Sequence, residues 1–149
     1  MQNDSPQSAT SAFQVLQNLY EAERQYMQAG GATAGASFDG MAATLDPSIV
    51  LHQSPDLPWG GNYFGHQGFK DWSIKMSECF DLLDVRDPEF FEQGSKVVIL
   101  CRLVTRSRLH GYELDRPMAQ VVTVRNGRIT EFRPFYWNVP EYVAAATPA

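Results

Sequence analysis

The sequence predicts a single α+β domain in which helices come first and a curved antiparallel sheet follows. Up to about residue 82, the longest segments carry apolar residues at helical spacing. After Asp87-Pro88 the pattern changes to an alternation of apolar and other residues, which is typical of strands. Helices followed by strands favour an α+β domain with helices packed on one face of the sheet. A chain of 149 residues fits one such domain.

The N-terminal segment is predicted to hold two helices after a polar tail. Residues 1–10 carry no apolar pattern, and we expect them to be disordered. Apolar residues recur at helical spacing over 11–29, which predicts a helix. The glycine-rich run 30–35 ends this helix and is expected to be a flexible link. Ser37 is a suitable N-cap for a short second helix over 37–45.

A strand, a loop and a third helix are expected next. Asp46-Pro47 breaks the second helix, and the β-branched residues of 48–53 predict a strand. The prolines and glycines of 54–65 predict a loop with at most a short hairpin strand. Residues 66–82 give the strongest helical pattern, because apolar side chains repeat along one face.

The remaining segments predict a sheet. Alternation marks strands over Glu89–Glu92, Lys96–Arg108, Tyr112–Arg125 and Arg128–Trp137. Asn126-Gly127 is a hairpin turn signal between the last two. Pro134 cannot donate a ladder hydrogen bond, so it predicts a bulge or an edge. A bulge would reset the alternation, and Phe132, Phe135 and Trp137 would then all point inward.

The alternation also sorts the strand faces. After Pro117, the bulkier face is predicted to point toward the core, and it leaves Gln120 as a lone amide among apolar neighbours. In the first strand, the alternation slightly favours Ile49, Leu51 and Gln53 as the buried set over the face that carries His52. An inward His52 would close the strand at the mouth of a pocket. A lone histidine there is more often structural than catalytic, although an imidazole can take and return a proton near neutrality.

Composition and charge exclude several classes of protein. The net charge is −5 without a basic stripe, which disfavours nucleic-acid binding. The first dozen residues do not resemble a signal peptide, and no apolar run is long enough to span a membrane. Cys79 and Cys101 are expected to be buried free thiols of a reducing compartment, so we expect a cytoplasmic protein. The scattered histidines 52, 66 and 110 indicate no metal site.

Three segments resemble the nuclear transport factor 2-like superfamily, and within it the SnoaL-like polyketide cyclases and ketosteroid isomerases. They are LDPSIVLHQSP (45–55), WGGNYFGHQGFKDW (59–72) and MAQVVTVRNGRITEFRPFYWN (118–138). The resemblance covers nearly all of 11–142, which it implies to be one domain, with 143–149 as a C-terminal tail. The implied fold is a cystatin-like α+β roll, in which the three helices close a cone formed by a bent antiparallel sheet.

The resemblance implies a site inside the cone. The isomerase segment similar to DPSIVLH ends in an aspartate that shuttles protons; here His52 takes its place, which turns His52 inward. The strand similar to AQVVTV holds a protonated carboxyl that stabilises an oxyanion, and Gln120 stands there. Tyr20 most nearly corresponds to the oxyanion tyrosine, and Trp137 to a cavity wall. Neither isomerase carboxylate is present, so steroid isomerisation is not supported. The Asp-Arg-Asp set of limonene-type epoxide hydrolases cannot be placed, because Arg102 falls on the outward face.

Two functions follow as hypotheses. The first is a cofactor-independent enzyme of the isomerase, cyclase, dehydratase or epoxide-opening type, acting on a small, largely apolar molecule of polyketide or terpenoid metabolism. In it, His52 accepts a proton while Gln120 and Tyr20 donate hydrogen bonds to a developing enolate oxygen. The second is a non-catalytic binding or assembly module, which the lack of an inward carboxylate favours. The expected cavity lining also includes Trp59, Tyr63, Trp72, Met76, Phe132, Phe135 and Trp137.

The outward strand face predicts self-association. Val98, Leu100 and Val104 share this face with Arg102 and Arg106. So much apolar surface favours burial against a partner. We expect a homodimer formed through the convex side of the sheet, in which each patch pairs with its own copy.

Overall fold

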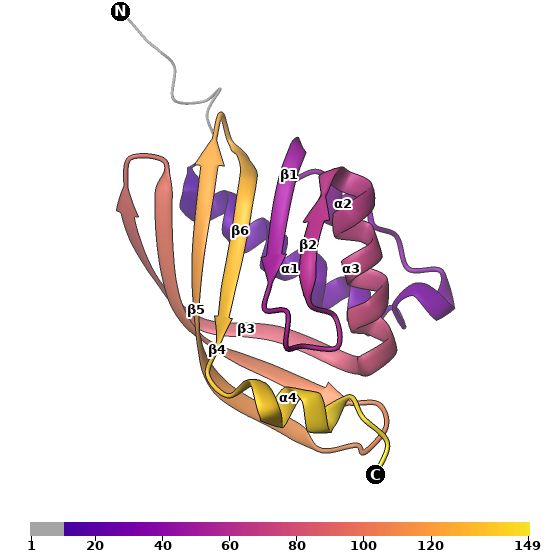
Figure 1. Cartoon of the computed structure of the whole chain (residues 1–149). Coiled ribbons are helices and arrows are strands. Elements are labelled where there is room, and N and C mark those ends of the chain that lie inside the picture. The colour runs from indigo at the N-terminus through magenta and orange to yellow at the C-terminus, as the bar shows by residue number, and fades with distance from the viewer. Residues whose placement is uncertain (1–10) are drawn as a thin grey trace, which may run out of the picture.

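A strongly curled six-stranded sheet organises residues 11–149, which are the residues that the computed structural model describes (Figure 1). The strand order is β2-β1-β6-β5-β4-β3, and the sheet does not close, because β2 and β3 form its two edges. Neighbouring strands are antiparallel except β1 and β6, which are parallel. The predicted α+β fold with a bent, mostly antiparallel sheet is confirmed. The expected disordered tail, 1–10, lies outside the described residues.

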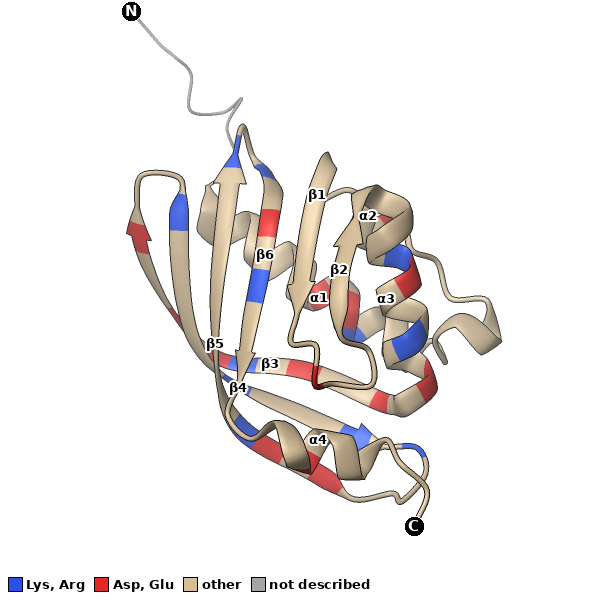
Figure 2. Cartoon of the chain, viewed as in Figure 1, with Lys and Arg blue, Asp and Glu red and all other residues tan. Residues whose placement is uncertain are grey.

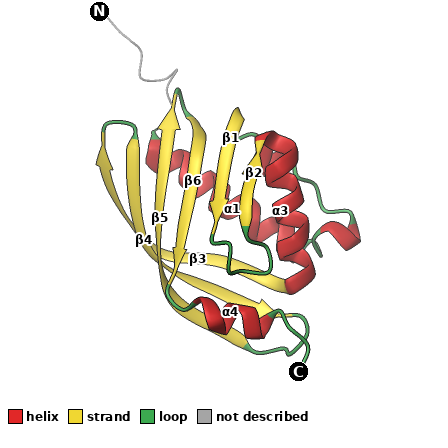
Figure 3. Cartoon of the chain, in the orientation of Figure 1, coloured by secondary structure: helices red, strands yellow, loops and turns green. Residues whose placement is uncertain are grey.

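Figure 3 separates the helices from the strands. The strands are β1 (Leu45–Gln53), β2 (Gly61–Phe64), β3 (Phe80–Gln93), β4 (Lys96–Ser107), β5 (Glu113–Arg125) and β6 (Arg128–Tyr136). The helices are α1 (Ala12–Gln28), the 3-10 turn η2 (Ala32–Ala34), α2 (Asp39–Ala42), α3 (Gly65–Cys79) and α4 (Val139–Ala145).

Helix α1 passes behind the sheet and supplies the wall opposite it (Figure 1). Ser11 caps the helix, since its side chain accepts a hydrogen bond from the Gln14 N–H at 3.1 Å. The rings of Phe13 and Phe90, 4.7 Å apart, attach the first turn to β3. The apolar face of α1 is buried as its spacing predicts, with one acidic exception, Glu23.

The expected flexible link over 30–35 is instead docked against α3. Gly31 has φ +67°, and a Cβ there would lie 2.4 Å from Ser77 Cβ, so only glycine allows this approach. The Ala32 N–H also donates to Ser77 Oγ at 3.2 Å. Helix α2 is shorter than the predicted 37–45, because β1 already begins at Leu45.

The strand β3 is much longer than the predicted 89–92. Helix α3 ends at Cys79 rather than at 82, and the chain turns directly into an extended strand. Asp87-Pro88 does not end the strand; Asp87 has φ +53°, and the pairing with β4 shifts register there. A proline is tolerated at this irregularity because β3 is an edge strand.

The three strands β4, β5 and β6 match their predicted segments closely, and the Asn126-Gly127 turn has the positive φ angles of +53° and +75° that its sequence predicts. Helix α4 was not predicted, because 143–149 was expected to be a tail. It covers the far end of the long strands (Figure 1). The Ser107 hydroxyl donates to the Ala145 carbonyl at 2.6 Å, and this bond helps to hold α4 in place.

Acidic and basic positions are interspersed along the outer strands (Figure 2). Arg102 pairs with Asp115 there, and Arg86 with Asp84. Val104 was expected to be exposed on the outward face of β4. It is buried instead, and its cross-strand neighbours are Asp84 and Asp115. Val98 and Leu100 are exposed as predicted.

Candidate functional site

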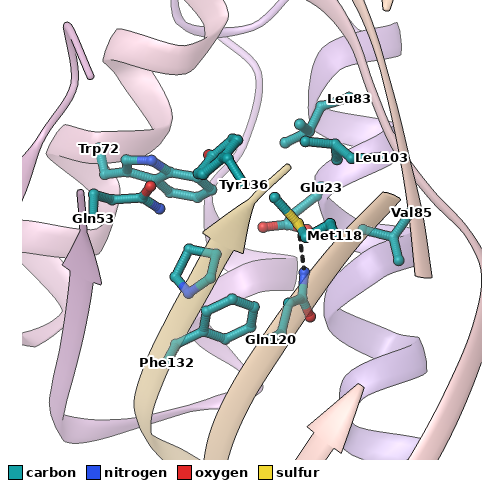
Figure 4. Close-up of a pocket in the computed structure, with 11 residues that line it drawn as sticks. Glu23, Gln53, Trp72, Leu83, Val85, Leu103, Met118, Gln120, Phe132 and Tyr136 are labelled. Carbon is teal, nitrogen blue, oxygen red and sulfur yellow. Dashed lines mark hydrogen bonds between the residues drawn. The ribbon is translucent and has the colours of Figure 1, made fainter. Parts of the chain in front are cut away.

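A small cavity lies between the concave face of the sheet and the helices α1 and α3 (Figure 4). Its volume of about 30 Å³ holds one or two water molecules. A larger ligand enters only if side chains move. The lining residues are Glu23, Gln53, Trp72, Leu83, Val85, Leu103, Met118, Gln120, Phe132, Pro134 and Tyr136.

Gln120 and Tyr20 meet at this cavity from β5 and α1. The Tyr20 hydroxyl donates to Gln120 Oε1 at 2.6 Å. Burial raises the pKa of Tyr20, with smaller contributions from Cys101 and Glu23, so the hydroxyl keeps its proton. Gln120 Nε2 faces Met118 Sδ at 3.5 Å, and a thioether is a weak acceptor. The amide N–H groups are therefore available to a ligand, while Tyr20 fixes the amide instead of reaching the ligand itself.

Glu23 is an inward carboxyl that was not predicted from the sequence. Its side chain is only 6% exposed, and it lines both this cavity and a smaller void beside Trp72. Burial alone raises its pKa to about 8, since no residue from 11 to 149 contributes a hydrogen bond or a nearby cation. The signal was present in the sequence: Leu16, Tyr20, Glu23 and Met27 follow one helical row.

Two other residues that line the cavity each hold a buried polar atom without a partner. Trp72 Nε1, on α3, and Gln53 Oε1, at the end of β1, are fully buried and make no hydrogen bond within the described part of the chain. The tryptophan is an N–H donor and the amide oxygen an acceptor. Both can bind a polar group once side chains around the cavity move, because each atom is shielded from solvent in the present packing.

The expectation that His52 points into the cavity is wrong. Ile49, Leu51 and Gln53 are the buried set of β1, as the alternation slightly favoured. Leu51 pairs with Phe132, and Phe132 pairs with Val122, which shares its face with Gln120. His52 and Gln120 thus lie on opposite faces of the sheet and do not form one site.

On the outer face, His52 belongs to a polar network that joins three strands. Its Nε2 lies 3.0 Å from Glu131 Oε2 on β6, and its Nδ1 lies 3.1 Å from Asn62 Oδ1 on β2. The His52 hydrogen bond, helped by Lys96 and Arg133, lowers the pKa of Glu131 to about 2. This arrangement fits a structural role for His52.

Phe135 and Trp137 do not point inward either, since they are 52% and 71% exposed. The expected bulge at Pro134 does not form, because the β5–β6 register runs without a break from Val122↔Phe132 to Met118↔Tyr136. The irregularity lies at Thr123/Val124 instead. Pro134 and Tyr136 consequently take the lining positions. The observed pairing of β1 with β6 stops at Phe132, so Pro134 does lie at an edge.

The other expected lining residues divide into three groups. Trp72 and Phe132 line the cavity. Trp59 and Tyr63 are buried outside it: the Trp59 indole donates to the Tyr136 hydroxyl at 3.3 Å, and the Tyr63 hydroxyl donates to the Trp59 carbonyl at 2.8 Å. Met76 lines the smaller void beside Glu23.

Within residues 11–149, no cluster of three or more His, Cys, Asp or Glu side chains is arranged to hold a metal ion. None of the described helices combines the length and the apolar character needed to cross a membrane.

The sequence profile of the SnoaL-like domain matches residues 24–132. Among solved structures, TerC crystallised with polyporic acid is 18% identical to this chain, with a TM-score of 0.74. The match covers 91% of this chain and 98% of the TerC chain. An NTF2-like protein from Burkholderia pseudomallei is 20% identical, with a TM-score of 0.74 and coverages of 91% and 96%. A protein of Jannaschia assigned to the SnoaL-like polyketide cyclases is 19% identical, with a TM-score of 0.70 and full coverage of both chains at 100%. No curated protein sequence matches the chain significantly.

Proposed function

Because the chain belongs to the SnoaL-like domain family, we propose that it is a cofactor-independent enzyme of the isomerase, cyclase or dehydratase type. A small, largely apolar substrate would bind in the cavity and react by acid/base chemistry. Glu23 carries this proposal: a carboxyl group buried in an apolar pocket, with its pKa raised to about 8, can exchange a proton near neutral pH. Glu23 therefore replaces His52 as the proposed proton-transfer group.

The proton transfer involves one carboxyl group in two roles. At pH 7 a group with a pKa of about 8 is neutral in about nine of ten molecules. Neutral Glu23 donates its proton to a carbonyl oxygen of the substrate, and the carboxylate so formed accepts the proton that leaves the adjacent carbon. The product is an enol, and Glu23 is restored. Isomerisation, ring closure or loss of a hydroxyl group can proceed from such an intermediate.

Gln120 supports this step through its amide. Its N–H groups, held by the Tyr20 hydroxyl, donate to the same oxygen as negative charge develops there. Tyr20 is then a positioning residue. Removing a donor of this kind lowers turnover by about a hundred- to a thousand-fold in other enzymes. Gln120→Leu should have an effect of this order, and Tyr20→Phe a smaller one.

Substrate entry requires the cavity to widen. Met118 lies beside Gln120 Nε2, and its unbranched, flexible side chain can move without a change of the backbone. The ligand oxygen would then replace Met118 Sδ as the partner of the amide. Apolar walls around this point, including Leu103 and Phe132, exclude water and favour an apolar skeleton.

Exchange of carbon-bound protons tests the proposal without knowledge of the natural substrate. Cyclopentanone is incubated with the protein in D2O, and the loss of its α-proton signal is followed by NMR. We expect Glu23→Gln to slow the exchange by about a hundred-fold or more, while the folded state is retained. The wild-type rate should fall above a pH of about 8, as the neutral carboxyl is lost.

Full exchange activity in both Glu23→Gln and Gln120→Leu would remove the case for catalysis. The cavity would then serve binding only, and a non-catalytic binding module would become the better description.

A further inference from the structure

The two unpartnered atoms in the cavity, Trp72 Nε1 and Gln53 Oε1, point to a specific ligand group. Within residues 11–149, only one other side-chain nitrogen or oxygen atom is fully shielded from solvent without a partner, Thr105 Oγ1, and Thr105 does not line the cavity. Folded proteins leave few buried polar atoms unpaired, because the lost hydrogen bonds to water are not replaced. A donor and an acceptor left unpaired in the lining of one pocket therefore indicate that a bound molecule supplies their hydrogen bonds.

The chemistry of the two atoms restricts that partner. The indole N–H of Trp72 can only donate, and the amide oxygen of Gln53 can only accept. A neutral hydroxyl group satisfies both, since its oxygen accepts and its hydrogen donates. A carbonyl oxygen would leave Gln53 unpaired, and an ammonium group would leave Trp72 unpaired. A carboxylate would bring negative charge against the Gln53 oxygen.

The position of the pair relative to the proposed reacting end is informative. In Figure 4, Trp72 and Gln53 stand on one side of the view, and Glu23, Met118 and Gln120 stand on the other. Apolar side chains such as Leu83 and Phe132 complete the lining. The lining thus places Trp72 and Gln53 apart from Glu23 and Gln120.

We propose that Trp72 and Gln53 form a hydroxyl-binding subsite, so that the ligand of this cavity is a largely apolar alcohol. Its hydroxyl group bridges Trp72 Nε1 and Gln53 Oε1, and its second oxygen, where the reaction occurs, lies near Gln120 and Glu23. The identification of this alcohol as a substrate rests on the proposed function. The subsite itself is a statement about binding.

Three size-matched probes test the subsite: cyclopentanol, cyclopentanone and methylcyclopentane. Each is titrated into the full chain while the indole N–H signals are followed by NMR, with Trp72 assigned from Trp72→Phe. We expect cyclopentanol to shift the Trp72 indole signal and to bind about five- to tenfold more tightly than methylcyclopentane. Equal affinities, or an unchanged Trp72 signal, would overturn the proposal and would mean that water alone occupies the site.

Two variants separate the donor from the acceptor. Trp72→Phe removes the N–H but keeps an aromatic ring, and it should weaken cyclopentanol and cyclopentanone alike. Gln53→Leu removes the acceptor and should weaken only cyclopentanol, by about five- to tenfold. Trp59→Phe is the matched control, because Trp59 does not line the cavity and its indole N–H is already paired with the Tyr136 hydroxyl. Equal losses for both probes in Gln53→Leu would contradict the bridging role of the hydroxyl.

Binding and catalysis can fail independently in these experiments. Glu23→Gln should lose proton exchange but keep the preference for cyclopentanol over methylcyclopentane, because Trp72 and Gln53 are unchanged. A normal hydroxyl preference with no exchange activity in any variant would keep the subsite and overturn the proposed enzyme. Proton exchange that depends on Glu23, without a preference for the hydroxyl probe, would keep the proposed enzyme and overturn the subsite.

Discussion

Glu23 places an ionisable group inside the apolar face of α1, and this makes the stability of the fold depend on pH. The folded state raises the pKa of this carboxyl from 4.5 to about 8, since burial disfavours its charged form. Below pH 4.5 the group is neutral in both the folded and the unfolded chain, so its burial carries no ionisation penalty. Above pH 4.5 the unfolded chain ionises first, so stability is lost progressively as the pH rises from 4.5 through about 8.

Glu23→Gln should remove this dependence. We expect the free energy of unfolding of the wild type to fall by up to about 4 kcal/mol between pH 5 and pH 9, and that of the variant to fall much less. Urea denaturation at the two pH values measures the difference. Parallel losses in both proteins would mean that Glu23 is not the group responsible.

At the scale of elements, the His52 network joins β1 to β2 and β6. The side chains of His52 and Glu131 are 26% and 32% exposed, so water screens their interaction and its contribution is modest. We predict that His52→Ala lowers the free energy of unfolding by about 1 kcal/mol or less. Its rate of cyclopentanone exchange should stay unchanged, because His52 faces away from the cavity. Loss of exchange with unchanged stability would show a catalytic role instead.

Glu131 gives the same network a pH signature. Its pKa is lowered from 4.5 to about 2, so its contribution to stability is present above pH 4.5 and is lost as the pH falls through about 2. In thermal melts, Glu131→Gln should remove the fall in melting temperature that Glu131 causes at acid pH, whereas His52→Ala should make this fall smaller.

The docking of the 30–35 segment on α3 depends on Gly31. Gly31→Ala combines a strained positive φ with a contact of 2.4 Å to Ser77 Cβ, and it should cost about 2 kcal/mol or more. Gly35→Ala is the matched control: its φ is +74°, but nothing lies within 4 Å of the added methyl group. Thermal unfolding of the two variants separates strain from collision. Equal losses would show that the contact with Ser77 is unimportant.

Local patterns predicted the elements well, and the limits of that prediction have identifiable causes. The alternation in β1 gave the correct buried face, whereas the positional resemblance turned His52 inward. A resemblance aligns positions and does not report which face a side chain takes. Pro134 correctly indicated an edge, but the register around it depends on pairing with β5, which is a tertiary property. Glu23 was overlooked because a carboxylate in an apolar row contradicts the expected pattern, and such contradictions are common at functional sites.

At the scale of the whole molecule, the convex face of the sheet carries an apolar row that crosses three strands. Leu100 on β4 pairs with Ala119 on β5, which pairs with Phe135 on β6. Leu100 and Phe135 are exposed, as is Trp137 just after β6. We therefore predict a homodimer through this face, with each row packed on its copy.

Light scattering at micromolar concentration measures the mass of the wild type, and Leu100→Glu should shift it to that of a monomer. Lys70→Glu, a charge change at an exposed position of α3 away from the sheet's convex face, is a suitable control. A wild-type monomer at these concentrations would contradict the prediction.

The parallel pairing of β1 with β6 has a consequence for the order of folding. The antiparallel run β3-β4-β5-β6 joins neighbours in the chain, whereas β1 must find a partner far along the sequence. Contacts between distant residues carry the larger loop-closure entropy, so β1 should dock last and detach first. Amide hydrogen exchange should then be faster in β1 and β2 than in β4 and β5. Gln53 lies on β1, so the cavity is complete only in the fully folded chain, and a nascent or partly opened molecule has no binding site.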